Sequence, residues 1–378
     1  MQNIKMIKRD KSVVTGKKNL KKLYTFKKFP VFFGCVDTPA KDDLLTDMSW
    51  AIDRETGVIQ LDKLVPLEIL YKEQHVDGTG PTWAKYYEDF AKYLMSQKPK
   101  SVLEIGGGAG KLAQICLDRS KKLTWMIVEP NPIIKRTDRL KVVDGFFETA
   151  NVLSTNYDCI SFSQLLEHIY DPMSFLESIS KSMNNDSKFV FAYPNLEYWL
   201  SHKFTNALNF EHTMFLTDTL LDWMIKMAGM KIVNKSFYKN HSVFYSVVKS
   251  TNFIKIGTPP KKYAKYKKYF EEYVDYHKKT VLSFNRQMKK YDSVYLFGAH
   301  IFSQYLINFG LDMKRILGIL DNSPLKQGRR LYGTDYIIES PEILRGKKDC
   351  AVILKVGIYR DEIYKQIKTI NPNLDVIE

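Results

Sequence analysis

The stretch "KSVLEIGGGAGKLAQICLDRS" (residues 100–120) decides the fold of this 378-residue chain. An apolar run, a glycine-rich turn and an amphipathic run follow one another, which predicts a strand, a tight turn and a helix. Glu104 ends the strand, and Gly106 and Gly108 lie in the turn. Glycine there permits positive φ values and lets a ligand approach the backbone closely. The stretch therefore predicts a nucleotide-type α/β unit, although dinucleotide enzymes carry a similar turn.

Alternating strands and helices continue downstream. The runs "TWMIVE", "LKVVDG", "YDCISFS" and "KFVFAYP" read as strands, with the helix "DPMSFLESISKSM" before the last. This alternation predicts a parallel sheet covered on both faces. A further helix, "TDTLLDWMIKMAGM", has Thr217 as its expected cap and Gly229 near its end. The runs "KIVNKSFY" and "SVFYSVV" then follow too closely for a helical crossover, so we expect them to pair antiparallel.

A linker and a second α/β unit follow. Pro259 and Pro260 interrupt the pattern, and a helix rich in tyrosine and lysine is expected over 261–290. The second strand, turn and helix begin at "DSVYLFGAHIFSQYLINFG". We predict an α/β fold in three domains. These are a small mixed N-terminal domain (1–85), a Rossmann-like domain (86–253) and a smaller C-terminal Rossmann-like domain (254–378).

Composition places limits on function. With 44% hydrophobic and 26% charged residues, the chain reads as a soluble globular protein. Its apolar runs are too short for a membrane span, and its basic start lacks the apolar core of a signal peptide, so we expect a cytoplasmic location. The cysteines are scattered without a C-x-x-C pair, which predicts no metal site and no disulfide framework. We expect these cysteines to be small buried apolar residues: Cys35, Cys116, Cys159 and Cys350.

The net charge of +15 raises the question of nucleic-acid binding. The lysines are spread along the whole chain, and no nucleic-acid motif surrounds the local runs. A solvated basic surface is the first interpretation. Anionic ligands, including nucleotide-linked ones, remain the alternative.

Two acids follow later strands of the first unit. Glu129 ends "TWMIVE", the position at which an acid accepts hydrogen bonds from ribose hydroxyls. Asp144 follows the third strand, where it would face an adenine amino group or serve as an ordinary turn aspartate. Together with E-x-G-x-G-x-G and the antiparallel last pair, these features resemble the class I S-adenosylmethionine-dependent methyltransferases. The resemblance implies S-adenosylmethionine as cofactor, held by Glu104, Gly106, Gly108, Glu129 and Asp144.

Two Glu-His pairs are expected at the carboxyl edge of the sheet, where ligands of open α/β folds bind. Glu167 and His168 lie in "SQLLEHIYDP", and Glu211 and His212 lie in "ALNFEHTMFLTD". Near neutral pH an imidazole beside a carboxylate can accept or give a proton. The alternatives are a packed or capping role for His168, and a second pair that caps the following helix.

A closer resemblance rests on the second pair. The string E-H-x-x-(aromatic)-x-T-x-x-x-L, the later A-G-M and "YKNHSVFYSV" resemble the three-domain C-methyltransferases of nucleotide-linked 4-keto-6-deoxy sugars. "LFGAH" and "LDNSPLKQGRRLYGTDYIIESPEIL" extend the resemblance into the C-terminal unit. It implies an N-terminal domain that closes over the active site and a C-terminal domain for the substrate. It implies His212 as the base, Glu211 and His168 as further catalytic residues, and substrate contacts by Tyr71, His75, Asn209 and His241.

Three departures limit the resemblance. Of the family's N-terminal zinc cysteines only Cys35 remains, Asn209 stands where the family has a tyrosine, and "HIFS" replaces small residues and a lysine in the C-terminal turn. The expected function is methyl transfer to a carbon of a nucleotide-linked sugar, in surface-glycan or deoxysugar biosynthesis. O-methylation of a nucleotide-linked or glycan sugar is the first alternative. A nucleic-acid methyltransferase, for which an Asn-Pro-Pro-aromatic site is missing, and a non-catalytic scaffold follow. We expect no membrane partner and no specific nucleic acid, and the sequence leaves the oligomeric state open.

Overall fold

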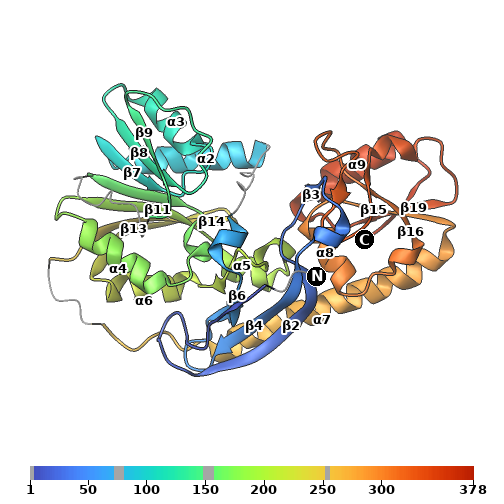
Figure 1. Cartoon of the computed structure of the whole chain (residues 1–378), viewed down its shortest axis with the longest axis horizontal. Helices are drawn as coiled ribbons and strands as arrows, with labels where there is room; N and C mark the ends of the chain where they lie inside the picture. The colour runs from blue at the N-terminus through green and yellow to red at the C-terminus, as the bar shows by residue number, and fades with distance from the viewer. Residues whose placement is uncertain (1–3, 72–80, 148–156, 252–255) are drawn as a thin grey trace.

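The computed structural model describes residues 4–71, 81–147, 157–251 and 256–378 (Figure 1). Three sheets form its main body, with seven, four and five strands. In Figure 1 the seven-stranded sheet lies at the left, the blue N-terminal strands at the lower centre and the orange and red C-terminal domain at the right. His75, one of the expected substrate contacts, lies outside the described residues.

The seven-stranded sheet has the order β13-β14-β11-β10-β7-β8-β9. Neighbouring strands from β11 to β9 are parallel, whereas β14 is antiparallel to both β11 and β13. The predicted parallel sheet with an antiparallel last pair is therefore confirmed. The strands are β7 (Ser101–Ile105), β8 (Thr124–Glu129), β9 (Leu140–Asp144), β10 (Cys159–Ser163), β11 (Lys188–Pro194), β13 (Met230–Tyr238) and β14 (Ser242–Lys249).

Helices cover both faces of this sheet because its central strands are apolar on both sides. On β7, Val102 belongs to one buried cluster, while Leu103 and Ile105 belong to the other, as the two-residue period of a strand requires. The first cluster includes residues of α2 (Pro81–Met95) and α3 (Lys111–Arg119). The second includes residues of α4 (Pro172–Ser182), α5 (Leu196–Ser201) and α6 (Asp218–Met227).

Helix α6 begins where the sequence predicts, but its expected cap acts differently. Thr217 is the N-cap residue, yet its hydroxyl makes no capping hydrogen bond to a backbone amide of the helix. It accepts a hydrogen bond from Tyr266 at 2.8 Å instead. Gly229 follows the helix with φ of 76°, which glycine adopts without the steric cost of a side chain.

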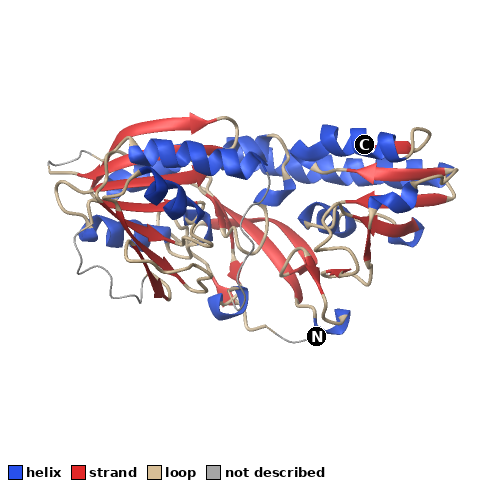
Figure 2. Ribbon diagram, turned by 90° about the horizontal axis from the view of Figure 1, so that it is seen from above, coloured by secondary structure: helices blue, strands red, loops and turns tan. Residues whose placement is uncertain are grey.

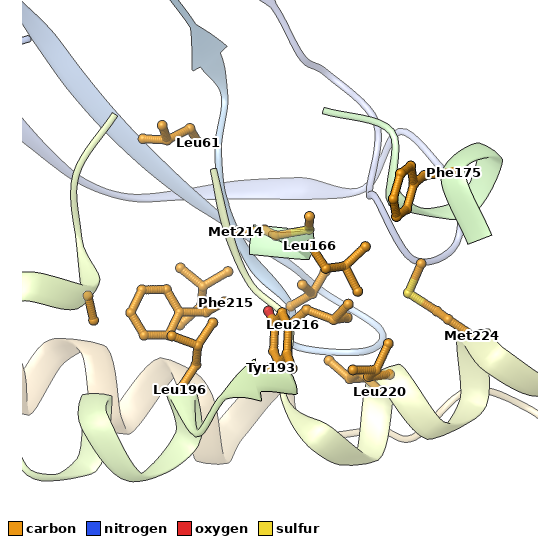
Figure 3. Close-up of a cluster of buried hydrophobic side chains, with 14 of the residues drawn as sticks. Leu61, Leu166, Phe175, Tyr193, Leu196, Met214, Phe215, Leu216, Leu220 and Met224 are labelled. Atoms are coloured by element: carbon orange, nitrogen blue, oxygen red, sulfur yellow. The ribbon is translucent and has the colours of Figure 1, made fainter. Parts of the chain in front are cut away.

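The N-terminal region forms an antiparallel sheet whose fourth strand comes from far along the chain. Its order is β12-β5-β4-β2, and β12 (Met214–Phe215) pairs with β5 (Ile59–Leu61). Figure 3 shows Leu61, Met214 and Phe215 in one apolar cluster with Leu166 and Tyr193. The other elements are β1 (Ile7–Lys8), which pairs with β6 (Lys63–Leu64), β2 (Leu20–Pro30), β4 (Leu45–Asp53) and α1 (Leu67–Leu70).

The C-terminal region is a smaller parallel α/β unit, as predicted. Its sheet has the order β18-β16-β15-β19-β20, and every pair is parallel. Helix α7 (Tyr263–Gln287) leads into it and also contacts β2 and β4. The remaining elements are β15 (Ser293–Phe297), α8 (Ile301–Asn308), β16 (Ile316–Leu320), β18 (Ile338–Glu339), β19 (Cys350–Leu354), α9 (Arg360–Ile370) and β20 (Asp375–Ile377).

The N-terminal strands join the two α/β domains. Figure 2 shows them crossing the space between these domains. Strand β3 (Cys35–Val36) pairs with β17 (Arg330–Leu331) of the C-terminal unit. All four cysteines are free; three are buried, and Cys35 is only partly buried on β3. None of the helices in the described ranges is both long and apolar enough to cross a membrane.

A buried ion pair fastens the N-terminal region to the C-terminal one. The two terminal nitrogens of Arg330 each lie 2.7 Å from one oxygen of Asp43. Arg330 also donates to the carbonyl oxygens of Thr38 and Thr334 at 2.8 and 2.7 Å. Asp43 accepts a further bond from the Gly333 amide. Both charges are therefore compensated although both side chains are buried.

We expect Asp43→Ala to lower the free energy of unfolding by about 3–5 kcal/mol, because it leaves a buried guanidinium without its counter-charge. Urea unfolding followed by tryptophan fluorescence measures the loss. The matched control is Asp37→Ala, which removes the exposed partner of Arg329 and should change stability by less than about 1 kcal/mol. Equal effects of the two substitutions would contradict the prediction.

Candidate active site

The glycine-rich turn lies at the carboxyl end of β7. Gly106, Gly108 and Gly110 have φ values of 69°, 53° and 72°, which favour glycine over residues with a side chain. A Cβ on Gly106 would lie 2.9 Å from the Leu165 side chain. The turn therefore packs directly against the segment that carries Glu167 and His168.

Glu129, at the end of β8, is the acid closest to this turn. Its Oε2 accepts a hydrogen bond from the Gly108 amide at 3.0 Å. Glu104 is buried beneath the turn, where its Oε2 accepts a bond from Trp125 Nε1 at 2.8 Å. This contact makes Glu104 a support of the turn, and its contact with a cofactor stays a prediction.

Asp144 stands next to Glu129 in the register of β8 and β9. Its carboxylate is exposed and forms an ion pair with Arg136 at 2.7 Å. Two acids thus end adjacent strands beside a turn of left-handed glycines. A nucleoside with ribose hydroxyls and an amino-bearing base matches this arrangement, because acids at such strand ends accept hydrogen bonds from these groups.

Four of the expected catalytic and substrate residues come together beside the turn. His168 ends the short helix Leu166–His168, and its Nδ1 lies 3.1 Å from the Tyr71 hydroxyl. The same Nδ1 lies 4.0 Å from a carboxylate oxygen of Glu211. The rings of His168 and His212 are perpendicular, with centroids 5.0 Å apart. Burial raises the pKa of Tyr71 well above its ordinary value, so its hydroxyl keeps its proton at neutral pH.

Tyr71 also connects this cluster to the segments that follow Glu129 and Asp144. Its carbonyl oxygen accepts a hydrogen bond from Asn131 Nδ2 at 2.6 Å, two residues beyond Glu129. Its ring contacts Phe146, just beyond Asp144, at 6.3 Å between centroids. The cluster around His168 and His212 and the glycine turn therefore lie at the same edge of the sheet.

One ring nitrogen of His212 takes part in a hydrogen bond to the backbone. Its Nδ1 lies 3.2 Å from the Ala207 carbonyl oxygen, an acceptor that requires the proton to be on Nδ1. Nε2 then carries the lone pair, as a general base needs. Burial lowers the pKa of His212, while Glu211 acts in the opposite direction. The imidazole is therefore neutral at pH 7 and can accept a proton at Nε2.

Asn209 shapes the loop that carries the second Glu-His pair. Its Oδ1 accepts hydrogen bonds from the amides of Glu211 and His212 at 2.8 and 2.7 Å. This is the local turn that asparagine side chains favour. The observed contacts are structural, and substrate contact by Asn209 stays a prediction. The helix-capping alternative for the Glu-His pair is wrong, because β12 separates the pair from α6 and Thr217 is the N-cap.

Glu167 is the most deeply buried acid of the cluster. Its side chain is 2% exposed, and its Oε2 has no hydrogen-bond partner. Burial raises the pKa of Glu167 to about 8. The sequence suggested no role for Glu167 itself, because the pattern L-E-H does not reveal which of the two side chains faces the protein interior.

Glu167, His168 and His212 also form the one group in the described ranges that offers metal ligands. Their candidate atoms lie within 4.8 Å of one another. Two ligands on opposite sides of a zinc ion lie about 4.2 Å apart at most, from bond lengths of about 2.1 Å. The Glu167 and His168 atoms, at 4.0 Å, are close to that limit.

His241 belongs to a different cluster. Its ring packs against Trp83 and Trp199, with centroids 5.1 and 5.7 Å away, and its Nδ1 lies 2.6 Å from the Ser242 hydroxyl. Burial lowers the pKa of His241 to about 4. Its neighbours lie outside the Tyr71, His168 and His212 cluster, so a substrate contact by His241 stays a prediction.

Three residues near the site were not predicted from the sequence to be site residues. Thr213 donates from its amide to the Glu167 carbonyl oxygen at 2.8 Å. Gln164, which has a positive φ of 53°, donates to the Ser242 hydroxyl at 2.8 Å. His300, at the head of α8, has a pKa lowered to about 4 by burial and by Lys326, whereas Glu211 acts in the opposite direction.

The strand order, the glycine turn and the two strand-end acids define the class I methyltransferase fold, whose cofactor is S-adenosylmethionine. Comparison with protein families supports the same class. Residues 79–235 match the family model described as a methyltransferase domain. Residues 259–373 match the C-methyltransferase C-terminal domain. Both matches are to methyltransferase families. No curated protein matches it in sequence.

Solved structures with similar folds include methyltransferases of several substrates. One is N,N-8-amino-8-demethyl-D-riboflavin dimethyltransferase from Streptomyces davawensis (18% identity, TM-score 0.38, covering 44% of this chain and 55% of that one). Others are mitomycin 7-O-methyltransferase (14%, 0.37, 45% and 55%) and human N-acetylserotonin methyltransferase (15%, 0.38, 45% and 53%). The chain spans about half the length of each of these proteins.

Replacing Glu129 should weaken cofactor binding. A hydrogen bond to a charged group contributes about 1.5–3 kcal/mol, so we expect Glu129→Ala to reduce the affinity for S-adenosylhomocysteine at least about tenfold. Isothermal titration calorimetry measures this. Asp118→Ala, on the exposed side of α3, is the control and should bind normally. Unchanged affinity in Glu129→Ala would remove the ribose role of this acid.

The buried acid should make stability depend on pH. The pKa of Glu167 is about 8 in the folded state and about 4.3 in an unfolded chain. The folded protein therefore holds more protons between these values, and its stability falls as pH rises through that window, by up to about 1.4 kcal/mol per pH unit. Glu167→Gln keeps the shape and removes the ionisation. Between pH 5 and 8 the melting temperature of the variant should fall less than that of the wild type; parallel curves would contradict the prediction.

Proposed function

We propose that this methyltransferase transfers the methyl group of S-adenosylmethionine to a carbon next to the keto group of a nucleotide-linked deoxysugar. The observation that carries the proposal is the neutral His212, whose Nδ1 is fixed by a carbonyl oxygen beside the donor turn. The match of residues 259–373 to a C-methyltransferase C-terminal domain supports carbon as the acceptor. The net charge of +15 suits an anionic nucleotide.

The residues present fit the cofactor. Gly106 and Gly108 would allow its close approach, Glu129 would hold the ribose, and Asp144 would face the adenine amino group. Glu104 would support the turn through Trp125. When bound there, S-adenosylmethionine supplies an electrophilic methyl group on a sulfonium, which needs no further activation.

The chain's own residues then hold the acceptor and move its proton. His212 Nε2 removes a proton from the carbon next to the keto group, which yields an enolate. The cofactor held at the glycine turn would supply the methyl group to this carbon and leave as S-adenosylhomocysteine, and His212 would release its proton to solvent. Positioning and proton removal are thus the protein's main tasks.

The neighbouring polar groups would stabilise the enolate oxygen and orient the base. Tyr71 keeps its hydroxyl proton and lies next to His168, so this pair would donate a hydrogen bond to the keto oxygen. Preorganised donors of this kind are worth about a hundredfold to a thousandfold in rate. The family tyrosine that Asn209 replaces would have been another such donor. Glu211 would hold a sugar hydroxyl or orient His212.

The C-terminal domain is the proposed holder of the nucleotide. His300 stands at the head of α8, and its ring packs 5.0 Å from Phe33 of the N-terminal region. The strand pairing of β3 with β17 fixes this junction. O-methylation of a nucleotide-linked or glycan sugar is the second candidate, because a neutral histidine base also serves a hydroxyl.

Hydrogen exchange distinguishes the two candidates. If His212 forms an enolate, a panel of nucleotide-linked keto sugars in heavy water with S-adenosylhomocysteine should show deuterium at one sugar carbon, even without methyl transfer. We expect His212→Asn to abolish this exchange and to lower turnover by about a hundredfold or more, while binding of S-adenosylhomocysteine survives.

NMR of the product provides the complementary measurement. A new carbon–carbon bond supports the proposal, whereas a methyl ether assigns the enzyme to oxygen. His202→Asn, a substitution on the exposed end of α5, serves as the control and should remain active. Full activity in His212→Asn would remove the histidine from the mechanism.

A further inference from the structure

All three guanidinium nitrogens of Arg9 donate hydrogen bonds to oxygen atoms beside the active site. Its Nε donates to the Leu61 carbonyl oxygen at 2.9 Å, and one terminal nitrogen donates to the Tyr170 carbonyl oxygen at 3.3 Å. The other terminal nitrogen donates to the carbonyl oxygen of Thr213. One side chain therefore ties together three segments that lie far apart in sequence: the end of β5, the loop after His168, and the residue after His212.

These contacts use the fork shape of arginine. The side chain is partly buried, and within the described ranges it forms no ion pair with a carboxylate. Burial lowers the pKa of Arg9 to about 9, so the group stays charged at neutral pH. Arginine offers five N–H donors in a fixed plane, whereas lysine offers a single point of charge. A lysine at this position would reach one of the three carbonyl groups, not all of them.

Thr213 is the node through which Arg9 acts. Its amide donates to the Glu167 carbonyl oxygen at 2.8 Å, and its hydroxyl lies 3.3 Å from the carbonyl oxygens of Glu167 and Ile169. Its carbonyl oxygen accepts from Arg9 and from the Leu61 amide. Thr213 therefore holds the loop of His212 against the short helix that ends at His168.

The apolar packing around Thr213 leaves the spacing of the His168 and His212 rings to its hydrogen bonds. Figure 3 shows Leu61, Leu166 and Met214 converging from three segments onto one apolar cluster. Apolar contacts resist separation but have little direction. The directional bonds around Thr213 act together with the pairing of β12 and β5 to fix the register of one segment on the other.

We propose that Arg9 is a positioning residue of the methyl-transfer reaction, which holds His212 and His168 at the spacing that lets both face one substrate. The inference rests on the proposed function for its kinetic consequence. It assigns a catalytic purpose to the N-terminal segment, which lies outside both regions that match known families.

The kinetic test compares three variants of the full chain. Displacement of a catalytic group by about 1 Å can cost about a hundredfold in rate, so Arg9→Met should lower kcat about a hundredfold and change KM for either substrate by less than about threefold. Arg9→Lys should remain almost as slow. In Arg9→Ala, added ethylguanidinium should restore part of kcat, whereas ethylammonium should not.

Arg139 provides the matched control. Its guanidinium also donates to carbonyl oxygens, those of Leu117 and Ser120 at 3.1 and 2.8 Å. It is buried to a similar degree but precedes β9, at the edge of the sheet opposite the site. Arg139→Met should therefore lose stability comparably while kcat stays within about twofold of the wild type.

A second measurement needs no substrate. In nitrogen-15 NMR spectra of the imidazole groups, Arg9→Met should shift the His212 and His168 signals and leave those of His277 unchanged. His277 packs in the core between Tyr273 and Phe309. Thermal unfolding and calorimetry with S-adenosylhomocysteine confirm in parallel that the variant is folded and binds the cofactor.

The outcomes separate this inference from the proposed function. Wild-type kcat in Arg9→Met, or unshifted His212 signals, overturns the positioning role. Parallel loss of stability, cofactor affinity and kcat, without rescue by ethylguanidinium, assigns Arg9 to folding alone and also overturns it. If the wild type methylates no nucleotide-linked sugar, the proposed function fails, while the imidazole signals still decide the role of Arg9.

Discussion

The pairing of β12 with β5 is the constraint on which the active site depends. Only two residues, Met214 and Phe215, form this strand, yet they join the N-terminal sheet to a loop that follows the fifth strand of the methyltransferase domain. The preceding residues Glu211 and His212 are carried to the carboxyl edge as a result. Such a short strand has little stability of its own, so the apolar cluster around it and the bonds of Thr213 supply what the ladder lacks.

Burial away from water also determines which side chains at this edge of the sheet are charged. Burial raises the pKa of Glu167 and lowers that of His212, so both groups favour their neutral forms although the protein as a whole is strongly basic. A neutral imidazole can accept a proton at once, whereas an imidazolium cannot. The cost is a buried carboxyl oxygen without a partner, and a cost of this kind is often found where function requires a particular protonation state.

The site is assembled from all three regions rather than from one domain. The glycine turn and both Glu-His pairs come from the methyltransferase domain, and Tyr71 and Arg9 come from the N-terminal region. Tyr305 of α8 donates to the Leu208 carbonyl oxygen on the loop that leads to the second pair. The buried pair of Arg330 and Asp43 and the pairing of β3 with β17 hold these regions in register.

Local patterns in the sequence determined the elements and the donor turn. Strand alternation, helical periodicity and the spacing of Glu104, Gly106 and Gly108 are short-range properties, because strand and helix periods and the demands of a tight turn act over a few residues. They also located both Glu-His pairs at the carboxyl edge, since parallel strands end on the same side of a sheet. The meaning of Asn209 was not accessible in this way, because its bonds to the Glu211 and His212 amides depend on how the loop closes.

Only the tertiary structure decided how these parts meet. The sequence does not show that β12 joins the N-terminal sheet, that Tyr71 reaches His168, or that Arg9 binds the carbonyl of Thr213, 204 residues away. Such contacts depend on many weak packing interactions over the whole chain, so they cannot be predicted from a short stretch of sequence. The same reason explains Glu167, whose neighbour His168 carries the more conspicuous chemistry: its raised pKa comes from burial, which exists only once the chain is folded.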